Sequence, residues 1–331
     1  MKPIVSFIVP VRNDAARLDT CLRSIVRNAH GSDRVEIIVV DNGSTDHSVA
    51  VARRLGAEVL SVEQGRVSAL RNQGASRARA DVLAFIDADN EIAAGWVYTA
   101  LECLRLPNTA VVGALYQAPV DGTWVQRTYG HLRGTPTGQH ETEWLGSGNV
   151  AVRRSAFEAV GGFDTSLETC EDVEFCHRIR ARGMRIISDE RLKSIHHGDP
   201  RTLAEVFSSE RWRGRDNLRV SFRRPIVWSG VPSAILPIVQ GVALGVGIAG
   251  VVTAFLTPWA GLLLITAALL SFTGTTGLRV MRAALRSRPR RTVGVLAAFV
   301  VASVFDVARA LALVSPAPHR AVRAPSATAA P

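Results

Sequence analysis

The sequence predicts an α/β domain with a mixed, mostly parallel sheet and flanking helices, followed by C-terminal transmembrane helices. Over the first 115 or so residues, short runs rich in β-branched residues alternate with helical stretches. Apolar strands separated by helices are typical of a parallel sheet covered on both faces. Up to about Arg224 charged residues are frequent, whereas from Pro225 the chain is mostly Ala, Val, Leu, Ile and Gly. This change indicates two parts in different solvents.

Five runs in the first part are predicted strands, at residues 5–9, 35–40, 58–62, 82–86 and 110–115. The helices predicted between them cover residues 15–28, 46–55, 67–79 and 94–106. Ligands of such sheets bind at the carboxyl ends of the strands, near a switch in strand order. The residues that follow each strand are therefore the first candidates for a functional site.

The second half of this domain has weaker signals. The stretch 121–140 is rich in Gly and Thr and is predicted to be a long surface loop. After it we expect strands and helices at 149–152, 155–160, 171–182 and 184–188. The stretch 202–222 mixes apolar and Arg residues and is predicted to be helical. Such a helix lies in a membrane interface or packs on the domain, and the sequence favours neither.

The C-terminal part contains candidate membrane spans. The stretches 235–256 and 259–277 carry no charged residue, and each is about 20 residues long, enough to cross a bilayer. A third, 293–314, contains Asp306 and Arg309, which can pair with each other because they are three residues apart on a helix. We therefore expect two or three transmembrane helices.

Two clusters of arginine flank the first two spans: Arg211, Arg213, Arg215, Arg219, Arg223 and Arg224, then Arg279, Arg282, Arg286, Arg288, Arg290 and Arg291. By the positive-inside rule both clusters face the cytoplasm. We expect a protein of the cell (inner or plasma) membrane whose first domain is cytoplasmic. The expected parts are a domain over 1–224 with an interfacial helix at about 200–224, a membrane region over 225–314, and a disordered tail over 315–331.

Composition limits the partners. The net charge is +10, but the chain has no zinc-finger, basic-zipper or RNA-binding signature. The Arg residues are densest beside the apolar segments, so we expect membrane lipids and no nucleic acid as partners. The four cysteines form no CxxC pair, which disfavours a zinc site or a disulfide framework and favours a reducing, cytosolic face.

Polar residues follow three of the predicted strands. The first strand ends at PVRND, from Pro10, and the second at DNGSTD, from Asp41. Asp41 can accept hydrogen bonds from a ribose or a base, although a loop with a helix cap explains the stretch equally well. The fourth strand is followed by Asp87, Asp89 and Glu91. Carboxylates this close raise one another's pKa, and a divalent cation removes the repulsion. We favour this interpretation over capping by Asp89 alone.

A second acidic cluster, ETCEDVE, opens the helix predicted at 171–182. The helix dipole favours acidic residues there, so capping explains the cluster unless one carboxylate acts as a general base. Upstream, GSGN at 146–149 would let an acceptor approach the backbone closely. His196 and His197 follow a strand-like run at 192–195. A role with metal or phosphate and a merely exposed pair are equally compatible with their position.

In chain order, these pieces resemble the family 2 glycosyltransferases, with their GT-A fold, over about residues 6–224. The matching stretches are SFIVPVRNDAARLDTCLRSI, IIVVDNGSTDHS, GRVSALRNQGASRARADVLAFIDADNEI and GSGNVAVRRSAFEAVGGFDTSLETCEDVEFCHRIRARGMRI. Four such stretches, in order and at matching spacing, are highly specific. The resemblance implies a nucleotide-sugar donor and a divalent metal, Mg²⁺ or Mn²⁺.

The resemblance also implies roles for individual residues. The nucleotide sugar would contact Pro10, Asp41, Arg71 and Asp87. The metal would be held by Asp87 and Asp89, with Glu91 and His196 as further ligands. Asp172 would be the base that deprotonates the acceptor hydroxyl, and the sugar would be transferred with inversion at its anomeric carbon.

The sequence departs from processive members of the family, which carry QxxRW near the membrane. The matching place, 208–212, reads SSERW, and the membrane part is too small for a polymer channel. We expect a single hexosyl or N-acetylhexosaminyl transfer to a lipid-linked or membrane-proximal acceptor, in polysaccharide or cell-envelope glycan synthesis. The alternative is a catalytically inactive membrane scaffold in a glycan-assembly complex. A dehydrogenase or nucleotidyltransferase is disfavoured because the first turn lacks G-x-G-x-x-G.

Overall fold

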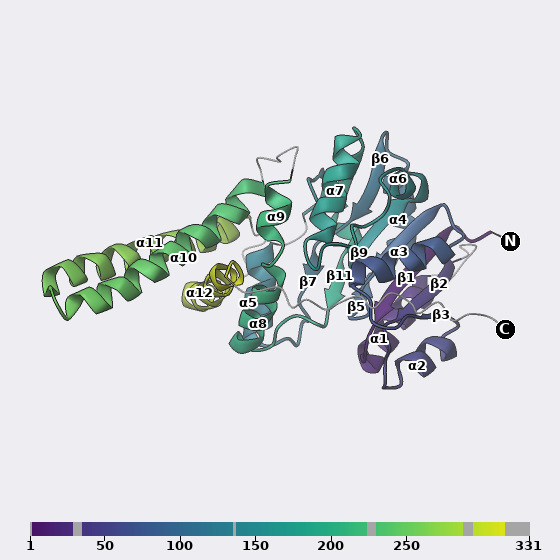
Figure 1. The fold of residues 1–331 in the computed structure, drawn as a ribbon. Helices are drawn as coiled ribbons and strands as arrows, with labels where there is room; N and C mark the ends of the chain where they lie inside the picture. The colour runs from purple at the N-terminus through teal and green to yellow at the C-terminus, as the bar shows by residue number, and fades with distance from the viewer. Residues whose placement is uncertain (1, 29–34, 135–136, 224–229, 287–293, 315–331) are drawn as a thin grey trace, which may run out of the picture.

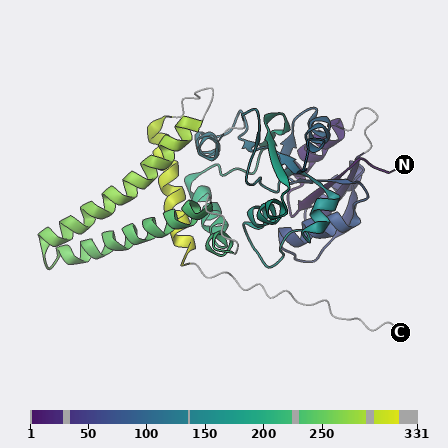
Figure 2. The same ribbon diagram turned by 90° about the horizontal axis from the view of Figure 1, so that it is seen from above.

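The computed structural model describes residues 2–28, 35–134, 137–223, 230–286 and 294–314. A long hairpin of two helices projects from a mixed α/β domain, and a third apolar helix lies at the base of the hairpin (Figure 1 and Figure 2). The predicted boundary at 224–225, the predicted tail at 315–331 and part of the second arginine cluster lie outside the described residues.

Eight strands form the main sheet, in the order β3-β2-β1-β4-β9-β6-β10-β8. Their bounds are β1 Val5–Val11, β2 Val35–Asp41, β3 Glu58–Ser61, β4 Val82–Ile86, β6 Thr109–Gly113, β8 Gln139–Glu141, β9 Asn149–Arg153 and β10 Arg185–Asp189. β9 runs antiparallel to β4 and β6, and β8 runs antiparallel to β10, whereas the other pairs are parallel. The prediction of a mixed, mostly parallel sheet is confirmed.

Helices cover both faces of this sheet, with one apolar core on each side. The first face carries α1 (Ala15–Asn28), α2 (Ser48–Arg54) and α4 (Trp96–Leu104). The second carries α3 (Val67–Arg77), α6 (Arg154–Ala159) and α7 (Glu171–Ala181). In β1, Phe7 and Val9 face the first core and Ile8 faces the second, so the strand is buried on both faces.

A second, three-stranded sheet consists of β5 (Asn90–Ile92), β11 (Ser194–His196) and β7 (Tyr116–Gln117). In it, His196 is paired in register with Asn90, the residue that follows Asp89. This small sheet therefore brings β11, near residue 195, beside the acidic residues that follow β4.

The prediction of a long surface loop at 121–140 is wrong for half of that stretch, because residues Trp124–Arg133 form a helix, α5. Thr123 and Gln126 form a capping box: the Gln126 N–H donates to the Thr123 hydroxyl, and the Thr123 N–H donates to the Gln126 side chain. Val125 and Tyr129 bury the inner face of the helix. The Gly and Thr content concealed this T-x-x-Q start signal.

The helix predicted at 202–222 is divided into α8 (Leu203–Arg213) and α9 (Asn217–Ser221). α8 is followed by its C-cap residue Gly214, where an added Cβ would lie 2.6 Å from the Cβ of Ala312. α8 packs against α5 and against the last apolar helix, α12 (Val295–Ala312). The close contact at Gly214 explains why this position has no side chain.

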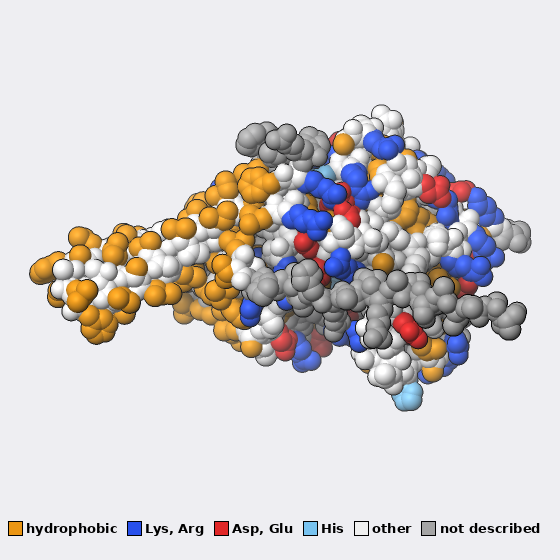
Figure 3. All heavy atoms as spheres, in the orientation of Figure 1, with side chains coloured by type: hydrophobic (Ala, Val, Ile, Leu, Met, Phe, Trp, Pro, Cys, Tyr) orange, Lys and Arg blue, Asp and Glu red, His pale blue; other side chains and the backbone are white. Residues whose placement is uncertain are grey.

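The other apolar helices, α10 (Val231–Ala254) and α11 (Pro258–Arg286), form the projecting hairpin. Apolar side chains cover its surface, whereas charged side chains gather on the α/β domain (Figure 3). By length and composition α10, α11 and α12 could each cross a membrane. At 1.5 Å per residue, the 24 residues of α10 and the 29 of α11 extend about 36 and 43 Å, more than a hydrocarbon core of about 30 Å.

The expected pairing of Asp306 with Arg309 is not what the structure shows. Asp306 accepts hydrogen bonds from the Thr276 hydroxyl at 2.8 Å and from Arg279 Nε at 2.9 Å. Arg309 instead donates to Glu210 Oε2 of α8 at 2.7 Å. Spacing along one helix could not reveal these partners, because they lie on helices packed against α12.

Glu210 links three helices. Its carboxylate accepts hydrogen bonds from Tyr129 of α5 and Arg213 of α8, and it pairs with Arg309 of α12. Burial raises its pKa, but the guanidinium groups of Arg309 and Arg213 lower the pKa below its ordinary value overall. The ionised carboxylate therefore depends on these donors for its stability in a buried position.

We expect Glu210→Ala to lower the free energy of unfolding by about 3–5 kcal/mol, because it leaves buried cations unpaired. Thermal or denaturant unfolding of detergent-purified protein measures this. Asp81→Ala, which removes the exposed partner of Lys2, is the control and should leave the free energy of unfolding nearly unchanged. Equally small effects of both changes would contradict the role of Glu210.

Candidate active site

A cavity of about 860 Å³ lies at the carboxyl ends of the central strands and continues to the base of the helical hairpin. Pro10 of β1, Asn42 after β2, and Asp87 and Asp89 after β4 line its inner end. Its outer end is lined by Leu236 and Pro237 of α10, Arg279 of α11, and Phe305 and Arg309 of α12. The cavity thus joins the predicted site to the apolar helices.

Arg71 of α3 connects the two acidic motifs. Its guanidinium donates to Asp87 Oδ1 at 2.7 Å and to Glu171 Oε1 at 2.8 Å. The Arg71 side chain is only 3% exposed, so it is stable there only because both carboxylates compensate its lost hydration. Ser147 also donates to Glu171, at 3.2 Å. The strand-end motif and the start of α7 therefore form one charged unit.

Two glycines allow the aspartates to lie against backbone. A Cβ added to Gly148 would lie 2.1 Å from Asp87 Oδ2, and one added to Gly198 would lie 1.8 Å from Asp89 Oδ2. The sequence suggested that the glycines at 146–149 give room to an acceptor. In the structure the room beside Gly148 is taken by Asp87 and by the Tyr116 hydroxyl, which accepts from the Gly148 N–H at 3.1 Å.

Asp89 begins a chain of polar contacts. His196 Nε2 lies 3.4 Å from Asp89 Oδ2, and its Nδ1 lies 2.7 Å from Asp199 Oδ1. Asp199 in turn pairs with Arg133 of α5. Burial raises the pKa of the Asp89 carboxyl, His196 opposes the rise, and the charge of Asp87 adds to it. The Asp199 contact fixes the imidazole with Nε2 directed to Asp89.

The predicted metal ligands are only partly brought together. Within the described ranges, no group of three or more His, Cys, Asp or Glu side chains converges closely enough to hold a metal ion. Asp89 and His196 face each other and fit a cation that takes its remaining ligands from phosphate and water. Asp87 is engaged by Arg71. Glu91 is directed elsewhere, to Arg27 at 3.1 Å and His197 at 3.2 Å.

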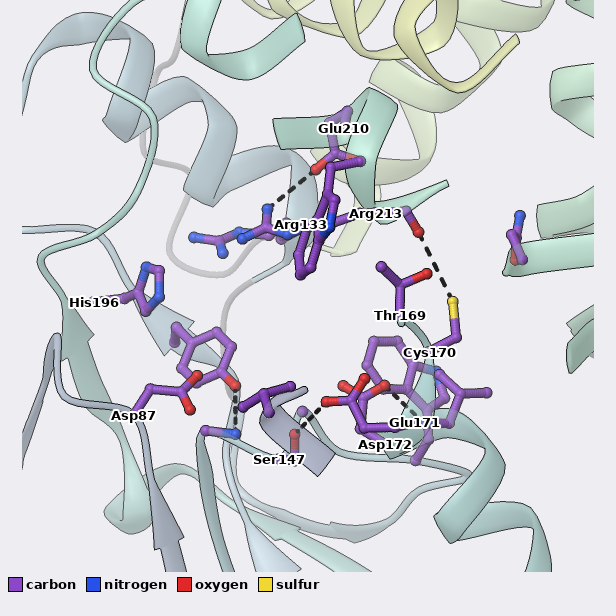
Figure 4. Close-up of a pocket in the computed structure, with 18 of the residues that line it drawn as sticks. Asp87, Arg133, Ser147, Thr169, Cys170, Glu171, Asp172, His196, Glu210 and Arg213 are labelled. Atoms are coloured by element: carbon purple, nitrogen blue, oxygen red, sulfur yellow. Dashed lines mark hydrogen bonds and ion pairs between the residues drawn. The ribbon is translucent and has the colours of Figure 1, made fainter. Parts of the chain in front are cut away.

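Asp172 lies at the N-terminus of α7, across the cavity from Asp87 and His196 (Figure 4). Its Oδ1 accepts from the Val173 N–H at 2.8 Å. Burial, and then the neighbouring charge of Glu171, raise the pKa of Asp172 to about 7. A carboxyl group with this pKa can take up or release a proton near neutral pH.

Cys170 sets the direction of this helix start. It has the left-handed backbone conformation, φ 60° and ψ 18°, which is uncommon for a residue other than glycine. Burial raises the pKa of its thiol to about 12, so the thiol is protonated at neutral pH and is not a nucleophile. Its contribution is the turn that directs Glu171 and Asp172 into the cavity.

The residues expected to contact the nucleotide differ in whether they line the cavity. Pro10 lines the cavity, as expected. Asp41 is buried behind it and accepts from the Ser44 N–H at 3.2 and 3.3 Å, whereas the adjacent Asn42 lines the cavity. Asp41 therefore shapes the turn after β2, which fits the loop interpretation, and its contact with a nucleotide stays a prediction.

Sequence reasoning did not assign to the site several other residues that line the cavity: Tyr116, Tyr129, Arg133, Glu210, Trp212 and Arg213. The Tyr116 ring packs on His196 with centroids 5.1 Å apart, and Arg133 lies over the Tyr129 ring at 4.6 Å. Tyr129 and Arg133 belong to the stretch predicted as a loop. The capping box of α5 was the one signal that could have placed them on a helix.

A mixed sheet of this order, with two aspartates after β4 and an acidic pair at the start of α7 facing one cavity, defines a glycosyltransferase domain of the GT-A fold. The family model described as glycosyl transferase family 2 matches residues 6–161, which make up most of the α/β domain.

Curated relatives agree with this family. The pre-mycofactocin glycosyltransferase of Mycobacterium tuberculosis is 28% identical over 234 residues, covering 67% of this chain and 48% of the relative, so the match spans about half of that protein. Glycosyltransferase AglE of Haloferax volcanii is 27% identical, covering 66% of this chain and 74% of the relative. The succinoglycan biosynthesis protein ExoA of Rhizobium meliloti is 25% identical, covering 72% and 77%.

The fold also matches a solved structure. The mannosyltransferase PcManGT from Pyrobaculum calidifontis, in complex with GDP-Man and Mn²⁺, superposes with a TM-score of 0.57 at 19% identity. The match covers 92% of this chain and 86% of that protein. It supports the fold over the α/β domain and into the apolar helices.

We expect Arg71→Met to lower the free energy of unfolding by about 3–5 kcal/mol, because Asp87 and Glu171 lose their shared cation while partly buried. Arg77→Met on the same helix removes an exposed pair with Glu58 and should leave the free energy of unfolding nearly unchanged. Denaturant unfolding measures both. A cost for Arg71→Met no larger than that of the control would show that the bridge is not structural.

The raised pKa of Asp172 predicts a pH-dependent stability. A folded-state pKa of about 7, against an ordinary value of 3.8, means that the folded state loses stability as the pH rises from about 4 to 7. We expect Asp172→Asn to raise the melting temperature, with a gain that grows over this range and levels off above it. Melting curves of both proteins between pH 4 and 9 test this. A constant difference would contradict the raised pKa.

Proposed function

We propose that the protein is an inverting glycosyltransferase of the cell membrane. It moves a hexosyl or N-acetylhexosaminyl group from a nucleotide-diphosphate donor to a lipid-linked or membrane-proximal acceptor, in polysaccharide or cell-envelope glycan synthesis. The observation that carries the proposal is the single cavity, which holds both acidic motifs and continues to the apolar helices. The relatives named for glycosyl transfer and succinoglycan biosynthesis support the class of product.

The donor end is the part of the cavity at the strand ends. A nucleotide sugar there would lie beside Pro10 and Asn42, with its diphosphate toward Asp89 and His196. These two residues would hold Mg²⁺ or Mn²⁺, with Asp87 nearby. Such a cation neutralises the charge that develops on a leaving diphosphate. The GDP-Man and Mn²⁺ in the mannosyltransferase complex are consistent with this pairing of ligands.

The base is Asp172 rather than Glu171. Glu171 is bound by Arg71 and Ser147, which hold its carboxylate in a fixed position. Asp172 accepts hydrogen bonds from the backbone N–H groups of Val173 and Ser147 but, in the part of the chain that the structure describes, has no side-chain cation bound to it, and its pKa is raised to about 7. It takes the proton of the acceptor hydroxyl as that oxygen attacks the anomeric carbon from the face opposite the departing nucleotide, so the configuration inverts.

The acceptor end is the outer part of the cavity. Arg213, Arg279 and Arg309 line it next to apolar residues of α10 and α12. Guanidinium groups beside an apolar wall suit a phosphate carried on a lipid. Anchoring by the hairpin raises the effective concentration of such an acceptor. Basic residues on both sides of the hairpin favour a cytoplasmic position of the domain.

We expect one nucleotide sugar to raise the melting temperature of detergent-purified protein in the presence of Mn²⁺. Binding to the folded state alone stabilises by about 2.7 kcal/mol at a ligand concentration 100 times Kd. Asp89→Ala should abolish the shift, and Asp81→Ala, an exposed change, should keep it. If no donor from a full panel shifts the folded wild-type protein, the chain is a scaffold rather than an enzyme.

We expect Asp172→Asn to keep the donor-induced melting shift and to reduce sugar transfer by about 10²–10⁴-fold, because only proton removal is lost. Transfer by the wild type should rise with pH up to about 7, the pKa of the free base, and then level off. Glu174→Gln, on the same helix but paired with Arg178, is the control. Wild-type transfer by the Asp172 variant would assign the base elsewhere.

A further inference from the structure

The third apolar helix does not run along the other two. In Figure 2 α12 crosses the base of the α10–α11 hairpin, and in Figure 1 it is seen nearly end-on while the hairpin extends sideways. α12 is also more enclosed: 39% of its most apolar 18 residues are buried within the protein, against 22% for α10 and 17% for α11. A larger share of the apolar residues of α12 than of α10 or α11 therefore packs against the rest of the protein.

The apolar partners of α12 belong to the α/β domain. Val301 is fully buried in a cluster with Val125 and Tyr129 of α5 and Val206 of α8. Near the end of the helix, Ala312 lies against Gly214, which closes α8. A helix surrounded by lipid in the middle of a bilayer could not share a core with these residues.

The polar contacts set the depth of α12. Arg279 follows Pro258 by 279 − 258 = 21 residues, about 31 Å of helix, which is close to the thickness of a hydrocarbon core. If α11 crosses the bilayer, Arg279 is therefore at its edge, and Asp306 pairs with it at 2.6 Å. Arg309, one turn further along α12, pairs with Glu210 of the α/β domain.

We propose that α12 is not a third span but lies in the plane of the membrane surface, wedged between the α/β domain and the hairpin. It brings Phe305 and Arg309 to the outer end of the cavity, where it forms a wall at the level of the lipid headgroups. The partner of its remaining face is the lipid surface. The end of α12 is then on the same side as the α/β domain. The proposal rests on the membrane anchoring in the proposed function.

Three versions of the full chain test this, each with one protease recognition sequence: at the N-terminus, between Leu256 and Thr257, or after Pro331. The turn tolerates an insertion because Leu256 is 84% exposed. Each version is digested in sealed membrane vesicles with the cytoplasmic face outward, with and without detergent. We expect the N- and C-terminal sites to be cut in sealed vesicles and the turn site to be cut only with detergent.

The outcomes separate this proposal from the one it rests on. A C-terminal site that is protected while the N-terminal site is cut would make α12 a span and overturn the inference. A turn site cut in sealed vesicles would show that the hairpin does not cross, which overturns the transmembrane hairpin on which this inference rests. Cleavage of all three sites in detergent confirms that each is accessible.

A second measurement avoids dependence on digestion. A fluorescent protein that matures only in the cytoplasm, and an alkaline phosphatase active only after export, are fused in turn to the C-terminus of the full chain. We expect fluorescence and no phosphatase activity, and the reverse result would overturn the in-plane position. Retention of the donor-induced melting shift by the purified fluorescent fusion shows that its α/β domain is folded.

Discussion

The buried guanidinium of Arg71 is the interaction on which the site depends. It joins Asp87, 16 residues away in sequence, to Glu171, 100 residues away. Without it, the carboxylates of Asp87, Glu171 and Asp172 would meet across one cavity with no fixed cation. With it, Glu171 is held beside Asp172, and its charge adds to the effect of burial in raising the pKa of Asp172 to about 7. The same guanidinium therefore fixes the position of Asp87 and influences the proton affinity of Asp172.

The site also depends on two positions without a side chain. Gly148 and Gly198 let Asp87 and Asp89 lie against the backbone, where a Cβ would collide with their carboxylates. The contacts from Asp89 through His196 and Asp199 to Arg133 then extend the site onto α5. Tyr129, also on α5, donates to Glu210, which pairs with Arg309 of α12. The polar framework of the cavity thus runs from the sheet to the apolar helices without relying on one element.

Local patterns predicted the elements, and long-range contacts decided the site. The β-branched runs and their spacing indicated the central strands, because burial on both faces leaves a continuous apolar signal. The acidic motifs after β4 and at the start of α7 were equally visible. No pattern could show that Arg71 joins them, that Glu91 is directed to Arg27 and His197, or that Arg309 pairs with Glu210, since each contact unites distant segments. The helix at α5 was missed because composition outweighed its capping box.

The shared core of α12 and the α/β domain affects how the protein can be divided. A shortened, water-soluble version ending before α10 would retain every acidic motif. It would also uncover Val125, Tyr129 and Val206, and remove Arg309 from Glu210. Such a version would have an exposed apolar patch, and the buried carboxylate of Glu210 would lose one of its cationic partners. We therefore expect the unit that folds as a whole to extend through α12, because the apolar helices share a core and ion pairs with the α/β domain.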